Sequence, residues 1–244
     1  MYSSEGKGQS MANHAIGIIG GTGPQGRGLA MRLALARQRV RIGSRREDRA
    51  MASAKELNGI LESAVPGLDK DPDFQWIEGG GNADVVRQSA IVMMTVPFEN
   101  AAETLRELVP HLQPGAIFVD VTVPLEFGKG DVMLLRPPEG SGSQHLRAIL
   151  PAAFPLVGAC KTQPAEILEQ LDVPLDCGDF VFSDSKPAKE TVIEILKRIP
   201  HLTPLDVGGL SAAATVEGMT ALLIRINRRH KVHSARFAVH GLHS

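Results

Sequence analysis

The chain has 244 residues, a formal net charge of −1 at pH 7 and a charged fraction of 22%, so no global positive field points to nucleic acid as a partner. Its two cysteines, Cys160 and Cys177, are too few for a disulfide framework, and as buried free thiols they fit a reducing cytoplasm. No apolar run approaches the roughly 20 residues of a membrane-spanning helix. We therefore expect a cytoplasmic protein with one extended domain or two small ones.

A strand, a glycine-rich turn and a helix are predicted directly after a polar leader. Residues 1–14 lack the apolar core of a signal peptide, so we expect them to be flexible. The apolar residues from Ile16 to Ile19 then predict a parallel strand that is buried on both faces. The G-x-G-x-x-G turn that follows is typical of a dinucleotide site, in which the helix N-terminus faces the pyrophosphate. Its residues are Gly21, Thr22, Gly23, Pro24, Gln25 and Gly26.

The loop after the second predicted strand, residues 40–43, indicates which dinucleotide is bound. NAD-selective sites usually have an acidic residue here, on the ribose 2′-hydroxyl. This chain has instead a hydroxyl and three guanidinium groups, which suit a 2′-phosphate because arginine offers paired donors and stays charged. The alternative is a solvated basic face at a helix start, where the helix dipole disfavours positive charge. We expect NADP to contact Ser44, Arg45, Arg46 and Arg49.

Strands and helices continue to alternate as far as residue 121. We expect helices at residues 50–61, 82–86 and 99–108, and strands at residues 74–78, 90–96 and 116–121. Five strands in this order predict a doubly wound α/β sheet of the Rossmann type. Residues just past the carboxyl ends of parallel strands line the ligand crevice. Those following the fourth and fifth strands are Thr95, Val96, Pro97, Val123 and Pro124.

The second half of the chain predicts a smaller α/β domain over residues 151–244, after an NADP-binding domain over residues 15–150. Residues 128–143 are rich in glycine and proline and are expected to form a mobile surface loop. Helices are expected at 165–171, 188–199 and 210–226, with strands near 175–182 and 204–207. The apolar stripe of the last helix suits either the core or a dimer contact. His230 and His233 in the basic tail lack further ligands, so we expect no metal site.

No catalytic triad, paired carboxylate or metal signature stands out, which suits an enzyme whose coenzyme carries the chemistry. Hydride transfer between two rings held face to face depends on proximity and needs no side-chain proton donor. Three functions stay open at this point. They are hydride transfer between NADP(H) and a second planar coenzyme, NADPH-dependent reduction of another small acceptor, and non-catalytic NADP sensing.

Five segments resemble the NADPH-dependent reductases of the deazaflavin coenzyme F420: IGIIGGTGPQGRGLAMRLA, IGSRREDR, MTVPFENA, DVTVPL and LSAAATVEGMTALLIRIN. The resemblance covers roughly residues 15–227, and its most specific part is the GGTG turn combined with the GSRR loop. It implies a Rossmann domain with a small C-terminal domain, a homodimer, and small-molecule partners rather than nucleic acid or membrane. NADP and coenzyme F420 would meet in the cleft between the domains.

The resemblance also implies roles for particular residues. Thr22 would lie near the pyrophosphate and nicotinamide, and the 2′-phosphate would be bound by Ser44, Arg45 and Arg49. Lys161 would either attract an acidic acceptor or lie at the surface. The two rings would stack beside a segment formed by Lys161, Thr162, Gln163, Pro164 and Ala165.

Overall fold

The computed structural model describes residues 15–128 and 131–242. Its centre is a parallel six-stranded sheet with the strand order β3-β2-β1-β4-β5-β8, which is the doubly wound order of dinucleotide-binding folds. The prediction of a Rossmann-type α/β fold is confirmed. The strands are β1 (Ile16–Ile19), β2 (Val40–Ser44), β3 (Glu78–Gly81), β4 (Ile91–Met94), β5 (Ile117–Asp120) and β8 (Leu156–Gly158).

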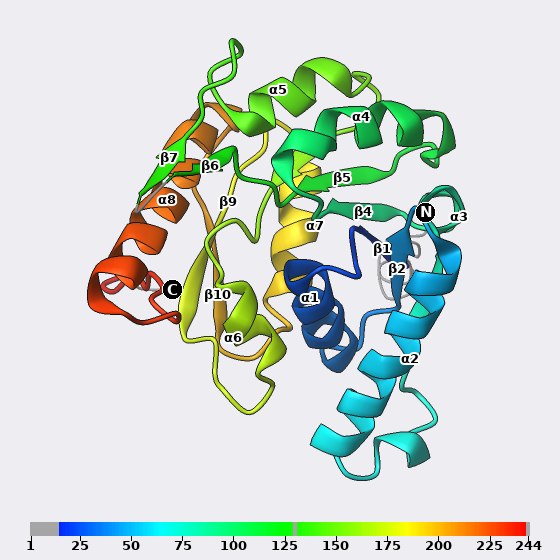
Figure 1. Cartoon of the computed structure of the whole chain (residues 1–244). Helices are drawn as coiled ribbons and strands as arrows, with labels where there is room; N and C mark the ends of the chain where they lie inside the picture. Colours follow the sequence, from blue (N-terminus) through cyan, green and yellow to red (C-terminus); the bar gives the residue numbers. More distant parts are fainter. Residues whose placement is uncertain (1–14, 129–130, 243–244) are drawn as a thin grey trace, which may run out of the picture.

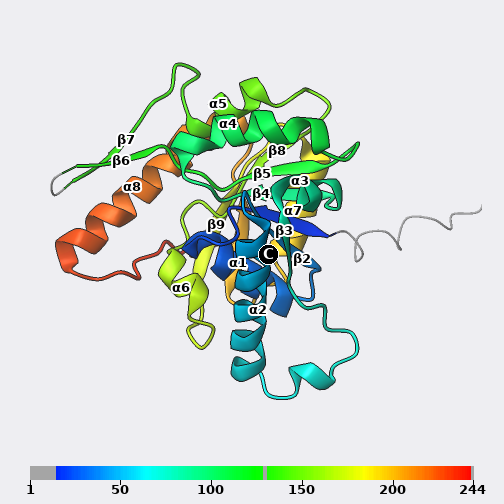
Figure 2. The same cartoon turned by 45° about the vertical axis from the view of Figure 1, so that its right-hand side comes forward.

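Helices cover both faces of this sheet (Figures 1 and 2). One core lies beneath α1 (Pro24–Leu35), α2 (Glu47–Ala64) and α7 (Lys186–Leu196), where Ile18 is buried. The other core lies beneath α3 (Asn82–Arg87), α4 (Phe98–Leu108) and α5 (Gly142–Ile149), where Ile19 is buried. Successive residues of a strand point to opposite faces, so neighbouring isoleucines of β1 serve the two cores. This explains the unbroken apolar run.

The remaining elements lie to one side of the large sheet. They are the antiparallel hairpin of β6 (Leu125–Phe127) and β7 (Val132–Leu134), the parallel pair of β9 (Cys177–Val181) and β10 (Leu202–Asp206), and the helices α6 (Ala165–Glu169) and α8 (Ala213–His230). Short 3-10 helices cover Leu68–Lys70, Val109–His111 and Leu210–Ala212. The hairpin lies along α8 at the left of Figure 1. In the described ranges, no helix is long and apolar enough to cross a membrane.

The third strand was predicted too early in the chain. Residues 74–77 form a loop, in which Phe74 and Trp76 pack edge to face with ring centroids 4.9 Å apart. The strand begins at Glu78 and continues through three glycines to Gly81. A Cβ at Gly79 would lie 2.3 Å from the carbonyl oxygen of Ala50 in α2. Glycine is required because the α2 backbone packs directly against this strand.

Two further predictions need correction. Residues 128–143 are not one loop: β7 and the start of α5 fall within them, while residues 129–130 lie outside the described part. Ser141 starts α5 by accepting a hydrogen bond from the backbone N–H of Gln144 at 3.1 Å. The large sheet also has six strands rather than five, since β8 pairs with β5. The sheet therefore extends past the predicted boundary at residue 150, and the leader at 1–14 lies outside the described residues.

Candidate functional site

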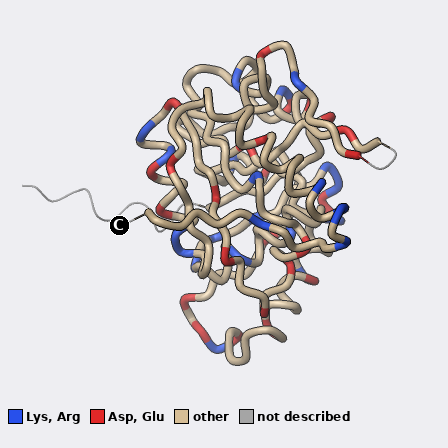
Figure 3. The backbone as a smooth tube through the Cα atoms, turned by 90° about the vertical axis from the view of Figure 1, so that its left-hand side faces the viewer, with Lys and Arg blue, Asp and Glu red and all other residues tan. Residues whose placement is uncertain are grey.

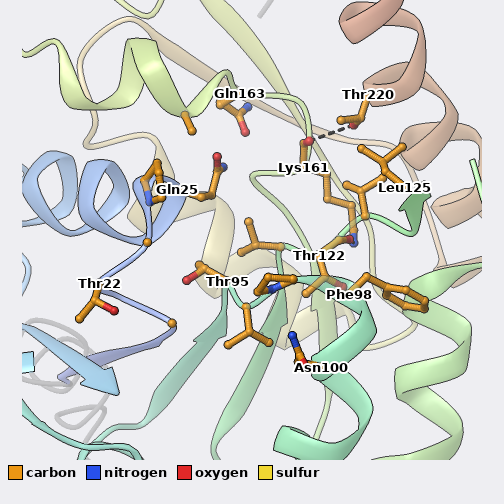
Figure 4. A pocket seen from close by; sticks show the side chains of 18 of the residues that line it. Thr22, Gln25, Thr95, Phe98, Asn100, Thr122, Leu125, Lys161, Gln163 and Thr220 are labelled. Carbon is orange, nitrogen blue, oxygen red and sulfur yellow. Dashed lines mark hydrogen bonds between the residues drawn. The ribbon is translucent and has the colours of Figure 1, made fainter. Parts of the chain in front are cut away.

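A cavity of about 820 Å³ opens at the carboxyl edge of the large sheet (Figure 4). Its walls come from the segments after each of the six strands, from one side of α8 and from Ala235 after α8. Most of the predicted site residues meet here, although their roles in binding stay predictions. Those lining the cavity are Thr22, Gly23, Pro24, Gln25, Ser44, Arg45, Arg46, Arg49, Thr95, Val96, Pro97, Val123, Lys161, Thr162, Gln163, Pro164 and Ala165.

Gly21, Gly26 and Pro124, by contrast, do not line this cavity and act through packing. A Cβ at Gly21 would lie 2.6 Å from the Cβ of Ile42, and one at Gly26 would lie 2.6 Å from the Cα of Gly21. These two glycines therefore let the turn and α1 pack closely against the sheet. Pro124 is buried beside α5, where its ring lies close to Gly142.

The N-terminus of α1 faces the cavity, and no side chain within residues 15–128 or 131–242 caps it. Gly23 precedes it in extended conformation, and Pro24 at the first helical position has no N–H to satisfy. The N–H groups of a first helical turn have no partner within the helix and attract anions. Gln25 donates from Nε2 to the carbonyl oxygen of Cys160 at 3.1 Å, which ties the turn to the far wall. This end of α1 fits a pyrophosphate.

The three arginines of the basic loop after β2 differ in whether they form an ion pair. Arg46 forms an ion pair with Asp48, with Nη2 and Oδ2 2.6 Å apart, and holds the pKa of that carboxyl below its usual value. Within the described part of the chain, neither Arg45 nor Arg49 has a carboxylate at ion-pair distance, and both are exposed at the cavity. Ser44 accepts the backbone N–H of Arg46 at 3.2 Å. Arg45 and Arg49 therefore keep their guanidinium donors for an anion.

Lys161 lies on the opposite wall and is buried, so the surface alternative is wrong. Its ammonium group is fully shielded from solvent. It donates to Oδ2 of Asp120 at 2.8 Å and to the carbonyl oxygen of Thr122, and Oε1 of Glu217 lies 3.7 Å away. Two carboxylates thus already compensate its charge. A buried ammonium needs such partners, since burial of an unpaired charge is costly.

The same carboxylates join three elements. Asp120, at the end of β5, also accepts from the hydroxyl group of Ser143 at 2.6 Å. Glu217, on α8, accepts the backbone N–H groups of Gly142 and Ser143 at 2.9 and 3.0 Å, which caps the start of α5. Asp120, Lys161, Ser143 and Glu217 form what we call the buried ion network. This network fixes the sheet, α5, α8 and the wall at Lys161 to one another.

The segment before Lys161 is anchored by a second buried acid. Cys160 has a left-handed backbone with φ of 55°, and its N–H donates to both carboxylate oxygens of Asp179, at 2.8 and 3.0 Å. Burial raises the pKa of Asp179, although these bonds oppose the rise. Burial likewise raises the pKa of Cys160, and that of Cys177 to about 11. The expectation of two free, buried thiols is confirmed.

Two amide oxygens at the cavity lack a protein partner. Gln163 donates from Nε2 to the carbonyl oxygen of Gly178 at 3.3 Å, but its Oε1 is buried with no donor in reach. Asn82 also lines the cavity, and its Oδ1 is likewise buried without a donor among the described residues. Buried polar atoms normally have partners. Both oxygens are also closed to solvent, so these two amides form part of the packed wall of the cavity.

The sequence reading missed the wall that α8 provides. Thr220, Leu223, Ile224 and Asn227 line the cavity, and Thr220 donates from its hydroxyl to the carbonyl oxygen of Lys161 at 2.9 Å. Their spacing of three and four residues places them on one side of the helix. The apolar stripe of this helix predicts a core or dimer contact, and it does not include the polar residues Thr220 and Asn227. Asn82, Phe98 and Asn100 were missed as well.

Known proteins place this arrangement in a family. A family model described as NADP oxidoreductase, coenzyme F420-dependent, matches residues 15–124. An F420-dependent NADP reductase of Methanocaldococcus jannaschii is 34% identical over 218 residues, which are 88% of this chain and 93% of the relative. Another, of Methanothermobacter thermautotrophicus, is 33% identical over 230 residues, 93% of this chain and 95% of the relative. The chain belongs to the F420-dependent NADP reductase family.

Solved structures agree with this family at the level of the fold. A crystal structure described as that of a candidate F420-dependent NADP reductase from Arthrobacter sp. FB24 has a TM-score of 0.74 at 22% identity. It covers 93% of this chain and 100% of the other. A 3-hydroxyisobutyrate dehydrogenase of Mycobacterium tuberculosis has a TM-score of 0.58 at 11% identity, over 84% of this chain and 57% of the other. These structures cover 93% and 84% of this chain, whereas the family model ends at residue 124.

Proposed function

We propose that this chain transfers a hydride between NADP(H) and the deazaflavin coenzyme F420, directly from ring to ring in the described cavity. One observation carries this proposal. A single cavity joins the free guanidinium groups of Arg45 and Arg49, the uncapped start of α1, and the wall between Lys161 and Ala165. The likeness to F420-dependent NADP reductases over most of the chain supports the same partners.

The lining fits NADP(H) at the end formed by β1 and β2. Arg45, Arg49 and Ser44 would bind the 2′-phosphate, since guanidinium groups form paired, charge-assisted hydrogen bonds with phosphate. The first turn of α1 would bind the pyrophosphate. From there the cavity continues past Val96 and Val123 to Gln163. This order follows a dinucleotide from its adenosine end to its nicotinamide end.

The ionisable side chains of the lining agree with hydride transfer that needs no protein acid. They are Arg45, Arg46, Arg49 and Lys161, and Lys161 is bound within the buried ion network. The two coenzymes supply the redox chemistry when bound. The chain contributes position: Pro97, Pro164 and Leu223 provide apolar contact, while Thr162 and Gln163 are buried polar groups. Holding two reactants in place can lower the activation barrier by about 7–11 kcal/mol.

The test mixes purified protein with NADPH and oxidised F420 and follows the visible absorbance of the deazaflavin. Loss of absorbance over many turnovers supports the proposal. If NADPH binds and the deazaflavin stays oxidised, but another carbonyl or imine compound is reduced, the acceptor is wrong. If NADPH binds and no acceptor is reduced, the protein is a sensor rather than an enzyme.

We also infer that the protein is a cytoplasmic homodimer divided into two domains. These three properties rest on the sequence and on the family resemblance. Light scattering of the purified protein tests the assembly: a mass of one chain, 26.1 kDa, would contradict it.

A further inference from the structure

A second groove continues the cavity beyond Pro164 and Ala165. It has a volume of about 620 Å³ and shares Pro164, Ala165, Ile224 and Asn227 with the main cavity. Beyond these shared residues its walls come from β6, from Glu166 in α6, from the end of α8 and from the segment that follows α8. Any molecule that fills the cavity near Ala165 can therefore extend into this groove without leaving the protein surface.

The groove carries positive charge. Arg228, Lys231 and His233 line it, and Glu166 is the one acidic residue of its described lining. The guanidinium of Arg228 lies over the ring of Phe127, 5.6 Å from the ring centroid. Among the described side chains, no carboxylate is at ion-pair distance from Lys231. Figure 3 shows the basic positions gathered at one edge of the molecule, next to the acidic positions of the hairpin.

The end of a helix alone does not explain this arrangement. Basic residues in the last turn of a helix interact favourably with the helix dipole, and α8 has three basic residues in its last turn. However, the backbone of this end is already closed, since Val232 donates to the carbonyl oxygen of Asn227 at 3.0 Å. The dipole also gives no reason for Lys231 and His233 to line a groove that is continuous with the cavity.

The groove lies at the end of the cavity that is remote from the 2′-phosphate loop. The loop after β2 is on the right of Figure 1, whereas α8 and the hairpin are on the left. A dinucleotide that follows the order described above has its phosphates near α1 and β2. The negative charge that this groove suits must then belong to the second substrate.

We propose that the groove formed by Phe127, Glu166, Arg228, Lys231 and His233 binds the anionic arm of the deazaflavin, which carries a phosphate and carboxylates. This inference rests on the proposed function. Lys231 and Arg228 supply charge-assisted contacts to the arm, and Phe127 holds the arginine in place by a cation–π contact. Because these groups are exposed, salt weakens their attraction.

The test compares oxidised F420 with the same deazaflavin lacking its phosphate and glutamate arm. In the double variant R228E/K231E we expect the KM for F420 to rise about tenfold, as several exposed contacts are lost or reversed. The KM for the truncated compound and that for NADPH should change less than twofold. The control K70E reverses one positive charge, on an exposed lysine of the 3-10 helix after α2, and it should leave all three values unchanged.

A similar KM for both deazaflavins in the unaltered protein, or an equal effect of R228E/K231E on both, would overturn the inference. A double variant that changes the mass in light scattering, and not the KM for F420, would show that a second copy covers the groove. Titration of deazaflavin fluorescence separates the two proposals. If binding depends on the arm but no turnover occurs, the proposed reaction is rejected and the assignment of the groove stands. If turnover occurs but does not depend on the arm, the proposed reaction stands and the assignment of the groove is rejected.

Discussion

The two ends of the main cavity both contain positively charged side chains, but these differ in burial and in ion pairing. Arg45 and Arg49 are exposed and, in the part of the chain that the structure describes, have no carboxylate at ion-pair distance. Lys161 is fully buried and has Asp120 and Glu217 around its ammonium group. In the first region the positive charge is free to meet a ligand. In the second it is already used to fix the surrounding elements.

A charged side chain in a cavity therefore indicates a ligand only when the partners of that charge are known. From the sequence, Lys161 suggests attraction of an acidic acceptor, just as the arginines suggest a phosphate. The structure supports this reasoning for the arginines alone. The network at Lys161 carries three formal charges, one positive and two negative, so it offers no excess positive charge to an anion.

The largest expected effect comes from removing the buried ammonium. In K161M, Asp120 and Glu217 remain buried without a cation, and we expect a loss of about 3–5 kcal/mol in the free energy of unfolding, the usual result of breaking a buried ion pair. Urea unfolding of the variant and the unaltered protein measures it.

Lys197 provides the matched control. Its ammonium is 2.7 Å from Glu194, and both side chains are more than half exposed. The same change, K197M, should cost less than about 1 kcal/mol, because exposed ion pairs contribute little. If K161M lowers the free energy of unfolding no more than K197M does, the buried ion network does not stabilise the fold.

The second largest effect concerns the free cations of the other region. We expect R45A to weaken NADPH binding by about 1.5–3 kcal/mol, the range for a hydrogen bond to a charged group, and to leave NADH almost unaffected. Isothermal titration with both nucleotides tests this.

R46A removes the same charge from the same loop and serves as its control. Because Arg46 is paired with Asp48, we expect a smaller loss of NADPH affinity than in R45A. Equal losses in both variants would mean that the loop acts through its total charge alone. Equal losses for NADPH and NADH would contradict the 2′-phosphate assignment.

Local patterns made much of this molecule predictable. The strand, glycine turn and helix around Gly21 and the basic loop at Arg45 depend on residues close together in the chain, so their spacing alone indicates the fold. The buried ion network could not be found in this way, because Lys161 and Asp120 are 41 positions apart. The hairpin was missed because its short strands, β6 and β7, depend on contact with α8. Likewise, β3 was misplaced because it consists mainly of glycines, which have low strand propensity.

The smallest predicted effect concerns Asp179, the buried acid behind Cys160. Burial raises its pKa above the usual 3.8, so this carboxyl binds a proton more readily in the folded protein than in the unfolded chain. Its stabilising contribution is therefore complete below about pH 4 and is lost as the pH rises through the folded pKa. In D179N this loss is absent, and an amide oxygen can still accept from the N–H of Cys160. We expect the stability of D179N relative to the unaltered protein to increase from about pH 4 to pH 8 in urea unfolding. A constant difference across this range would mean that the carboxyl ionises as easily in the fold as in the unfolded chain, and that its hydrogen bonds from Cys160 fully offset its burial.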